Sequence, residues 1–519
     1  MKKILNAESI PLSSILPLEF DAFSNAIVKA VSEGKRVCAF FGMPGGKPDV
    51  IEVFVLLADD NRNQLMVARS TIEGPSFPSL TPRCPQVHLF EREIAEQFGL
   101  VATGHPWFKP VRYIHSWTGK DPWSEGAAGG VGADKPILPG VGDFYRVEGE
   151  QVHEVGVGPV HAGVIEPGHF RFQCYGEEVF HLEIALGYQH RGVEESLIKG
   201  PNSRTLHYME TLSGDSTIGH ATNYSQIMES LSGTQIPARA QVIRGIALEL
   251  ERLANHIGDL GALSLDVGFL PTASFCGRIR GELLNMTALL CGNRFGRGMI
   301  RPGGTGFDLE LERICELLRR VEINERDARN AINLLWDNQS VMARFEDTGP
   351  LTKENAIDLG LVGPAARATG LVRDVRYNQA SGFYRFAQIP VSSYDSGDVF
   401  ARAYVRWLEI QQSFTFIRDQ LSCLPAGPVM TPVKTVAGGT DAGGNLAGER
   451  LAVSLTEGWR GEMCHVAITD EKGLFSRYKI VDPSFHNWMG LARALRNQGI
   501  SDFPICNKSF NLSYCGHDL

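Results

Sequence analysis

The amino-acid sequence predicts an α+β protein in which a small N-terminal α/β domain precedes a larger, helix-rich domain with small β elements. Residues 1–118 mix strand and helix patterns, residues 119–148 are rich in glycine and proline, and long helical patterns follow from residue 149 onward. A chain of 519 residues is long enough for more than one domain. We therefore expect a small domain at 1–118, a linker at 119–148 and a large domain at 149–519.

The small domain is expected to contain two helices and two strands. Residues 20–31 and 87–98 show amphipathic spacing, and the second segment places apolar residues such as Ile94 among charged neighbours. Residues 36–41 and 50–57 are rich in β-branched and aromatic side chains, and an MPGGKPD turn separates them. These patterns together predict a compact α/β unit.

The segment at 119–148 differs from both flanks in composition. It contains KDPWSEGAAGGVGADKPILPGVGD, which has few apolar side chains that could form a core. We expect this segment to act as an interdomain linker.

The large domain begins with strand patterns and continues with helices. Residues 152–183 alternate like short strands, whereas residues 240–263 carry aliphatic side chains at spacings of three and four. Glu249, Arg252 and His256 form a polar stripe beside these aliphatic residues, and we expect a buried hydrogen-bond network that joins helices. Further helices are expected at 308–339, 352–360 and 397–422, and further strands within 451–482.

Composition and charge exclude several classes of protein. Hydrophobic residues make up 43% and charged residues 21%, as in soluble globular proteins. The net charge of −9 argues against a nucleic-acid partner, because nucleic-acid-binding proteins present a basic face. No apolar run is long enough for a membrane helix, and no export signal or dinucleotide fingerprint is present. The ten cysteines include no Cys-x-x-Cys pair, so we expect reduced thiols in a cytoplasmic protein.

Two stretches combine histidines with glycine-rich turns. GPVHAGVIEPGHF contains His161 and His169, and GYQHRGVEE contains His190, Arg191 and Glu194. A strand-loop-strand tip can turn such a histidine toward a cavity. From the residues alone, both a structural role and a role in proton transfer remain open.

Many stretches of the chain resemble two subunits of respiratory complex I fused into one polypeptide. HLFEREIAEQFGLVATGHPWFKPVRY, at 88–113, is similar to the 30-kDa subunit. The rest of the chain resembles the 49-kDa subunit and the large subunits of nickel–iron hydrogenases. The stretches that carry this resemblance are GPVHAGVIEPGHF, GYQHRGVEE, ELERLANHIGDLG, NRFGRGMIRPGG, LVGPAARATG, GDVFARAYVRWLE, WRGE and SRYKIVDPSF. The fusion, with EPGHF and DFPICNKSFNLSY, looks most like the energy-converting (group 4) hydrogenases, of the hydrogenase-4 and formate-hydrogenlyase kind.

The resemblance implies four positions at which hydrogenases bind nickel and iron through cysteine. In this chain they fall on Ser213, Ser216, Ser484 and Asn487. Low-valent nickel and iron require soft thiolate ligands, which hydroxyl and amide oxygens cannot replace. We therefore expect no nickel–iron centre and no other metal, and a former metal cavity filled by hydrogen-bonded polar groups.

In complex I the same place is a quinone pocket, and the resemblance implies a proton donor there. It assigns this role to His169, with Asp266 as the carboxylate that would raise the pKa of the imidazole. The tyrosine that donates the second proton falls on Gly214, and a neighbouring arginine falls on Thr211. The pocket therefore departs from both groups of relatives.

These expectations describe a large peripheral-arm subunit of a membrane-associated oxidoreductase complex. The resemblance implies an iron–sulfur small subunit and membrane ion-translocating subunits as partners, on the cytoplasmic face of the cell membrane. This chain itself is expected to bind no cofactor, although a quinone fits the family. His190, Arg191, Glu194, Arg460 and Glu462 are expected to be structural or interface residues. The alternatives are a non-catalytic scaffold and, least favoured, an active nickel–iron hydrogenase.

Overall fold

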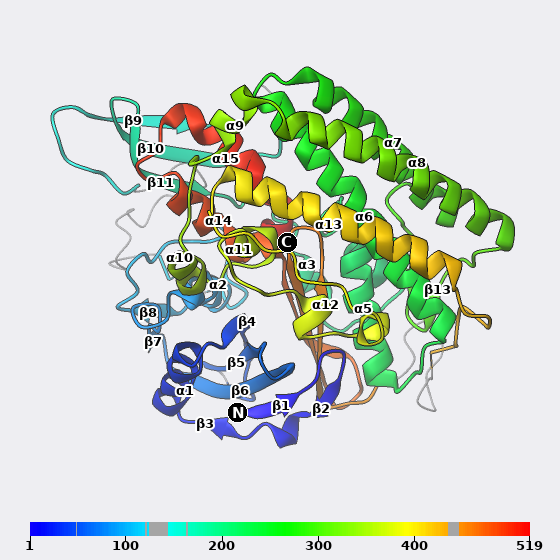
Figure 1. Ribbon diagram of the computed structural model, residues 1–519. Coiled ribbons are helices and arrows are strands. Elements are labelled where there is room, and N and C mark those ends of the chain that lie inside the picture. The colour runs from blue at the N-terminus through cyan, green and yellow to red at the C-terminus, as the bar shows by residue number, and fades with distance from the viewer. Residues whose placement is uncertain (48, 120–121, 124–143, 162–164, 434–445) are drawn as a thin grey trace.

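The computed structural model describes residues 1–47, 49–119, 122–123, 144–161, 165–433 and 446–519. Most of the predicted linker at 119–148 lies outside the described residues. Figure 1 shows the N-terminal domain at the bottom, a small sheet at the centre and a group of long helices above it. The C-terminus lies near the middle of the molecule in this view (Figure 1).

The N-terminal domain is built around a five-stranded sheet in the order β1-β6-β5-β4, with β3 beside β6. Its strands are β1 (Lys2–Ile4), β3 (Pro17–Leu18), β4 (Arg36–Pro44), β5 (Val50–Asp59) and β6 (Gln64–Glu73). The other elements are η1 (Leu12–Ser14), α1 (Phe20–Ser32), β7 (Ser76–Pro78), η2 (Pro85–Val87), α2 (His88–Phe98) and β8 (Val101–Thr103). The predicted helices and strands are present, and β6 is an additional strand that the sequence analysis did not predict.

Two antiparallel sheets belong to the large domain. The first has the order β11-β10-β9 and consists of β9 (Val152–Val157), β10 (His169–Tyr175) and β11 (Glu178–Ala185). The second has the order β16-β15-β14-β2 and consists of β14 (Arg450–Glu457), β15 (Glu462–Thr469), β16 (Phe475–Val481) and β2 (Ser9–Pro11). Strand β2 comes from the N-terminal end of the chain, so one sheet joins the two domains. The short strands β12 (Ile300–Arg301) and β13 (Gly304–Thr305) form a separate pair.

The long helices of the large domain pack against one another above the second sheet (Figure 1). They are α5 (Thr217–Ser232), α6 (Ala238–Asp266), α7 (Leu270–Cys291), α8 (Leu311–Trp336) and α13 (Val399–Ser422). The shorter helices are α3 (Val193–Ser196), α4 (Thr205–Glu210), α9 (Gln339–Phe345), α10 (Lys353–Leu359), α11 (Gly363–Arg367), α12 (Val375–Asn378), η3 (Gly382–Arg385), α14 (Pro483–Ala494), η4 (Ile500–Asp502), α15 (Phe503–Phe510) and α16 (Tyr514–Asp518). The aliphatic stripe predicted at 240–263 is buried along α6, as its spacing requires.

The hydrophobic core of the N-terminal domain continues into the large domain. Phe90 of α2 packs against Phe485 of α14, with ring centroids 5.0 Å apart. Leu451, Val453 and Val466 of the second sheet belong to the same buried cluster as the strands of the N-terminal sheet. The two domains therefore share apolar surface, whose burial stabilises their contact.

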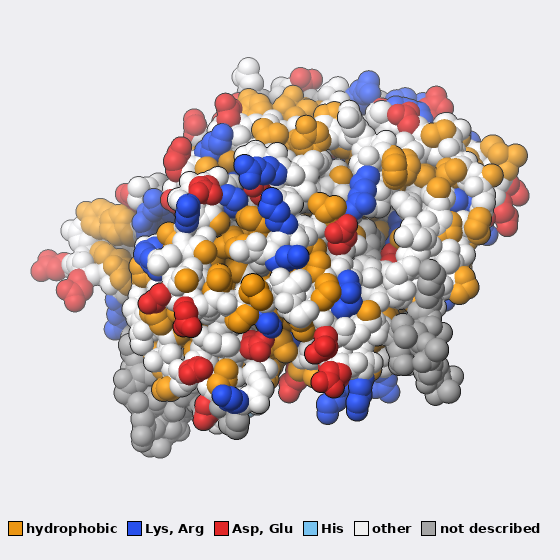
Figure 2. All heavy atoms as spheres, turned by 90° about the horizontal axis from the view of Figure 1, so that it is seen from below, with side chains coloured by type: hydrophobic (Ala, Val, Ile, Leu, Met, Phe, Trp, Pro, Cys, Tyr) orange, Lys and Arg blue, Asp and Glu red, His pale blue; other side chains and the backbone are white. Residues whose placement is uncertain are grey.

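The face seen in Figure 2 carries basic and acidic side chains interspersed with hydrophobic ones. Neither sign of charge forms a continuous field on this face, in keeping with a net charge of only −9 over 519 residues. Within the described residues no helix is both long enough and apolar enough to span a membrane.

Candidate functional site

Three of the four positions that the sequence analysis singled out meet in one buried cluster. The Oγ atoms of Ser213 and Ser513 lie 3.0 Å apart, and the backbone N–H of Ser513 donates to Ser484 Oγ over 2.8 Å. Ser216 and Ser213 both donate to Asp215 Oδ1, at 3.3 and 3.0 Å. All four serines are at most 2% exposed. We call these serines, with Asp215 and Arg460, the serine cluster.

An ion pair stands at the centre of the serine cluster. The Arg460 guanidinium donates to both carboxylate oxygens of Asp215, at 2.6 and 2.8 Å. Burial alone would raise the pKa of Asp215, but Arg460 outweighs this effect and lowers it. Arg460 also lies over the Trp459 ring, 3.9 Å from its centroid. A bidentate pair of this kind fixes the orientation of both groups.

A close backbone contact positions Arg460. Gly461 has a φ of +134°, and a Cβ atom there would lie 2.8 Å from the Cα of Gly363. Only glycine accepts this combination of conformation and contact without strain. The loop between β14 and β15 can therefore lie directly against the start of α11, which places Arg460 over Asp215.

A chain of hydrogen bonds leads away from the serine cluster through Asp482. Asp482 Oδ1 caps α14 by accepting from the N–H of Ser484 at 2.8 Å, and Oδ2 lies 3.3 Å from His220 Nε2. His220 Nδ1 lies 3.0 Å from His465 Nε2, and His465 Nδ1 lies 3.0 Å from the Tyr478 hydroxyl. If Tyr478 donates to His465, each imidazole donates in turn toward Asp482 and every group is satisfied with both histidines neutral. Burial lowers the pKa of His465 well below its usual range, in keeping with this neutral form.

Asn487 has a different role from the three serines. Its carboxamide oxygen accepts from the backbone N–H of Val362 at 3.0 Å, and its nitrogen donates to the Val362 carbonyl at 3.1 Å. Both polar ends of the side chain are thus used to hold the segment before α11. The sequence analysis grouped Asn487 with Ser484 because the resemblance places metal ligands at both positions, and the structure gives the two side chains different partners.

The expected pairing of His169 with Asp266 is not found among the described residues. His169 Nδ1 lies 3.2 Å from the carbonyl oxygen of Gly158, and its Nε2 is buried without a hydrogen-bond partner among those residues. Asp266 is the last residue of α6 and is exposed. Burial lowers the pKa of His169, which is opposite to the shift that a carboxylate partner would cause.

Arg191 and Glu194 do not pair with each other in the structure. Arg191 donates to the carbonyl oxygens of Thr211 and Leu212, both at 2.8 Å, and so supports the loop that carries Ser213. Glu194 instead accepts from Lys479 at 3.0 Å and contacts Arg477 at 2.9 Å. The neighbouring His190 Nδ1 lies 2.8 Å from the carbonyl oxygen of Asp518 near the C-terminus.

Ion pairs also connect the two domains. Arg36 of β4 contacts Glu462 of β15 over 2.5 Å and Asp60 over 2.8 Å. In α2, Glu93 forms ion pairs with Arg112 and, at 2.7 Å, with Lys479. Glu462 is therefore a domain-interface residue, whereas Arg460, two positions earlier, belongs to the serine cluster.

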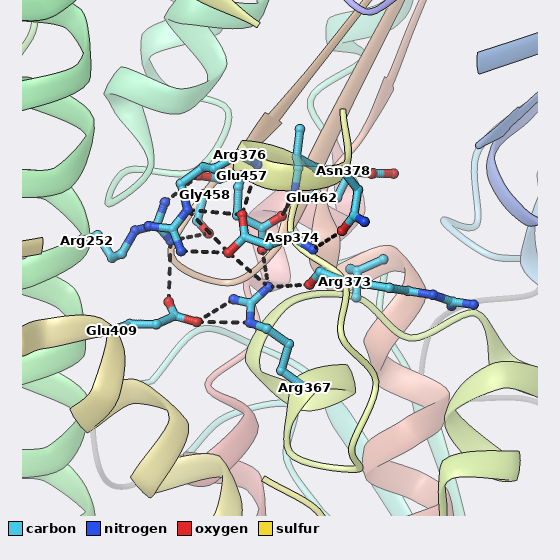
Figure 3. A network of polar contacts seen from close by, with 12 residues as sticks. Arg252, Arg367, Arg373, Asp374, Arg376, Asn378, Glu409, Glu457, Gly458 and Glu462 are labelled. Carbon is cyan, nitrogen blue, oxygen red and sulfur yellow. Dashed lines mark hydrogen bonds and ion pairs between the residues drawn. The ribbon is translucent and has the colours of Figure 1, made fainter. Parts of the chain in front are cut away.

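Glu249, Arg252 and His256 belong to a larger network of charged side chains. Figure 3 shows part of this network, with Arg252 of α6 near Glu409 of α13 and Glu457 at the end of β14. Arg252 lies 3.1 Å from Glu249, and His256 Nε2 lies 2.9 Å from Glu409. The charge network consists of Glu249, Arg252, His256, Arg367, Asp374, Arg376, Glu409 and Glu457. Arg252 also donates to the carbonyl oxygens of Glu457 and Gly458, which start the loop that leads to Arg460.

Sequence reasoning missed several residues on which the site depends. Asp215 was visible as a single charge inside the small-residue segment LSGDST, but its partner Arg460 lies 245 positions away. His220 and His465 gave no local signal, and Asp482 was visible only as part of the motif SRYKIVDPSF. Each of the three lies in a different element, and they meet only in the fold. Within the described residues no group of three or more histidine, cysteine or acidic side chains is arranged to hold a metal ion.

Comparison with known proteins identifies the family. The model of the respiratory-chain NADH dehydrogenase 30-kDa subunit matches residues 25–127, and that of the 49-kDa subunit matches residues 266–518. A carbon monoxide-induced hydrogenase of Rhodospirillum rubrum is 30% identical over 361 residues, which are 69% of this chain and 97% of that protein. The chain belongs to the family of 49-kDa NADH dehydrogenase subunits and their hydrogenase relatives. It carries a 30-kDa subunit domain fused in front.

Two further relatives match both parts of this fused 30/49-kDa subunit. Formate hydrogenlyase subunit 5 of Escherichia coli is 28% identical over 449 residues, covering 85% of this chain and 76% of that protein. An NADH-quinone oxidoreductase subunit of Bdellovibrio bacteriovorus is 25% identical over 482 residues, covering 89% of this chain and 86% of that protein. The fused subunit is thus related to both the hydrogenase and the quinone-reducing branches, and its relatives are subunits of oxidoreductase complexes.

Proposed function

We propose that this chain is the large peripheral subunit of a membrane-associated electron-transfer complex and holds no nickel–iron centre. It would work beside an iron–sulfur cluster of a small partner subunit and couple electron transfer to membrane ion-translocating subunits on the cytoplasmic face of the cell membrane. The observation that carries the proposal is the serine cluster at the positions where the resemblance places metal ligands.

The donor set of the serine cluster does not suit nickel or iron. Ser213, Ser216 and Ser484 offer hydroxyl groups, which stay protonated at neutral pH and are hard donors. Each of these hydroxyls is already engaged by Asp215 or Ser513. Both oxygens of the Asp215 carboxylate, the one anionic donor of the serine cluster, are already bound by Arg460.

A quinone-like ligand is the proposed redox partner of this region. Supporting it, His169 is only 6% exposed, and its Nε2 has no hydrogen-bond partner among the described residues. A buried imidazole nitrogen without a partner is costly unless another group uses it. Because Nδ1 faces a carbonyl oxygen, the neutral ring carries its proton there, and Nε2 could accept a proton from the hydroxyl group of a reduced quinone. The Phe144 ring lies 5.4 Å from the His169 ring and adds an aromatic wall.

A scaffold role is the competing proposal, and one observation favours it. No carboxylate among the described residues pairs with His169 and could exchange a proton with it, and Asp266 is exposed at the end of α6. A subunit that only binds its partner subunits would need the fold and the domain interfaces, but no residue that exchanges protons with a ligand.

Metal analysis of the assembled complex tests the absence of the nickel–iron centre. We expect iron at the level of the partner's clusters and no nickel in the purified complex. Stoichiometric nickel that resists chelation would overturn the proposal, because it would mean that oxygen and amide ligands hold the metal.

Substitution of His169 separates the electron-transfer role from the scaffold role. H169Q should leave assembly with the small subunit unchanged and reduce quinone-linked turnover at least tenfold, because the buried group that exchanges a proton with the quinone is lost. The matched control is H153Q, which replaces an exposed histidine on the neighbouring strand β9. Equal turnover in H169Q and H153Q at normal assembly would favour the scaffold.

A further inference from the structure

The charge network contains more acid than base. Four carboxylates, those of Glu249, Asp374, Glu409 and Glu457, face the three guanidinium groups of Arg252, Arg367 and Arg376. Each of these side chains is at most 4% exposed. With every carboxylate ionised and His256 neutral, one negative charge is left without compensation. An uncompensated charge away from water is strongly unfavourable, so the network should hold a proton.

We propose that this network binds one exchangeable proton from solvent and that Glu457 carries it. The inference rests on the proposed function for its purpose, which is to compensate negative charge that arrives at the neighbouring redox site. The binding step itself involves only the chain: a carboxylate oxygen of Glu457 takes a proton from water, and no electron moves.

Glu457 has the weakest compensation of the four carboxylates. Its Oε1 accepts from one guanidinium, Arg367 Nη1 at 2.7 Å, and its Oε2 accepts from the N–H of Val375 at 3.0 Å. Glu409 Oε1, in contrast, accepts twice from Arg367, while its Oε2 meets His256. Asp374 accepts from both Nε and Nη2 of Arg376. The proton is therefore best placed on Glu457.

The surroundings of Glu457 support the same choice. Burial, followed by the negative charge of Asp374, raises the pKa of Glu457 to about 7. For Glu249, the effect of burial is outweighed by Arg252 and Arg376, and its pKa falls to about 2. Burial lowers the pKa of His256 although Glu409 opposes the shift, so the imidazole does not take the proton.

The other charged groups near Glu457 already have partners. Arg244 lines the same cavity as Glu457 and pairs with Glu229 over 2.6 Å. Arg406, whose charge acts on Glu409 and His256, pairs with Asp259 over 2.8 Å. These neutral pairs leave the balance of the network unchanged.

Glu457 lines a small cavity that adjoins a surface groove. Glu457 lines a cavity of about 40 Å³ together with Thr222, Gln226 and Tyr384. This volume is enough for about two or three water molecules. The cavity shares four wall residues, Gln226, Ile236, Gln241 and Gly382, with a wider surface groove of about 570 Å³. Water in the cavity would bring the proton to the carboxyl group.

The charge network lies next to the serine cluster, so a charge in the serine cluster changes the proton affinity of the network. Glu457 is the last residue of β14, and Arg460 follows three positions later in the connecting loop. Between them, the Trp459 indole N–H donates to the carbonyl oxygen of Asp215 at 3.0 Å. Negative charge at the serine cluster would therefore raise the proton affinity of Glu457.

Infrared difference spectroscopy during a pH titration of the full chain tests the proposal. We expect the carbonyl band of a protonated carboxylic acid to disappear as the pH rises through about 7, and E457Q should lose this band. The matched control is E251Q, because Glu251 is also buried and its pKa is raised to about 8, mainly by burial. E251Q should remove a band that titrates higher and leave the Glu457 band.

A second variant keeps the test decisive if E457Q folds poorly. Gln241 lines both the cavity and the groove. Q241L makes this shared wall apolar, so the Glu457 band should shift at least threefold more slowly after transfer to heavy water. Persistence of the band in folded E457Q, or equal exchange in Q241L and the wild type, would overturn the inference. Nickel in the complex would instead overturn the proposed function and leave the infrared result intact.

Discussion

His486, on helix α14, shows how one buried residue makes the free energy of unfolding depend on pH. It is 5% exposed, and its ring meets Phe90 of the N-terminal domain with centroids 5.6 Å apart. Burial lowers its pKa from 6.5 to about 4. Between these values the unfolded chain binds a proton that the folded chain does not, so stability is lost as the pH falls from about 6.5 toward 4.

H486Q should therefore weaken the acid dependence of stability. Between about pH 7.5 and about pH 5, the wild type should lose roughly 2 kcal/mol more unfolding free energy than H486Q, because each pKa unit corresponds to about 1.4 kcal/mol. Urea unfolding at the two pH values measures the difference. H153Q, at an exposed position, should behave like the wild type, and an unchanged pH dependence in H486Q would contradict the burial argument.

At the scale of elements, the N-terminal end of the chain completes a sheet of the large domain. Strand β2 pairs with β14, with Ile10 opposite Leu451. Just before β2, the Asn6 side chain donates to the carbonyls of Gln379 and Leu455, at 2.6 and 2.9 Å, and accepts from the Leu455 N–H at 2.7 Å. Asn6 thus extends the ladder with its side chain where the backbone pairing ends.

N6A should lower the unfolding free energy by about 3 kcal/mol, because it removes three buried hydrogen bonds of roughly 1 kcal/mol each. Chemical denaturation followed by tryptophan fluorescence measures the change. N25A is the matched control, since Asn25 accepts from Arg83 in an exposed hydrogen bond and its loss should cost no more than about 0.5 kcal/mol. A loss in N6A as small as that in N25A would show that β2 does not depend on this side chain.

At the scale of the whole molecule, we expect the fused domains to behave as one folding unit. Their contact combines a shared apolar core, the β2–β14 pairing and the buried pairs of Arg36 with Glu462 and Asp60. Arg36 is 4% exposed, so its removal would leave two carboxylates buried with their main cation gone.

Residues 1–118 and 149–519, co-expressed as separate polypeptides, should copurify as a stable complex. R36M should weaken this association by about 3 kcal/mol, because breaking a buried ion pair leaves uncompensated charge. The dissociation constant measured by titration of the two fragments reports the effect. R69Q, which alters a partly exposed pair within the N-terminal domain, should leave the constant unchanged. Separation of the unmodified fragments on a sizing column would refute the single-unit description.

The local parts of this architecture could be predicted from neighbouring residues. The buried stripe of α6 and the helices near 311–336 and 399–422 follow from spacing that repeats over one or two turns. Strands β4 and β5 follow from their β-branched and aromatic residues, whereas β6 was not predicted. Helix α7 escaped this reasoning because its buried residues, such as Cys276 and Leu283, are interspersed with glycines and polar side chains. The family was also accessible from motifs, because they occur in order along nearly the whole chain.

The sequence by itself determined the α+β class, the order of the two subunit-like parts and which residues stand at the four positions where the resemblance places metal ligands. Only the tertiary structure decided how charged groups pair: Arg460 with Asp215, Arg36 with Glu462, and His169 with a carbonyl instead of Asp266. The physical reason is the distance along the chain between the residues that interact. Periodicity is a property of neighbours along the chain, whereas the partner of a buried charge can lie hundreds of positions away, as for Arg460 and Arg36, and is selected by packing.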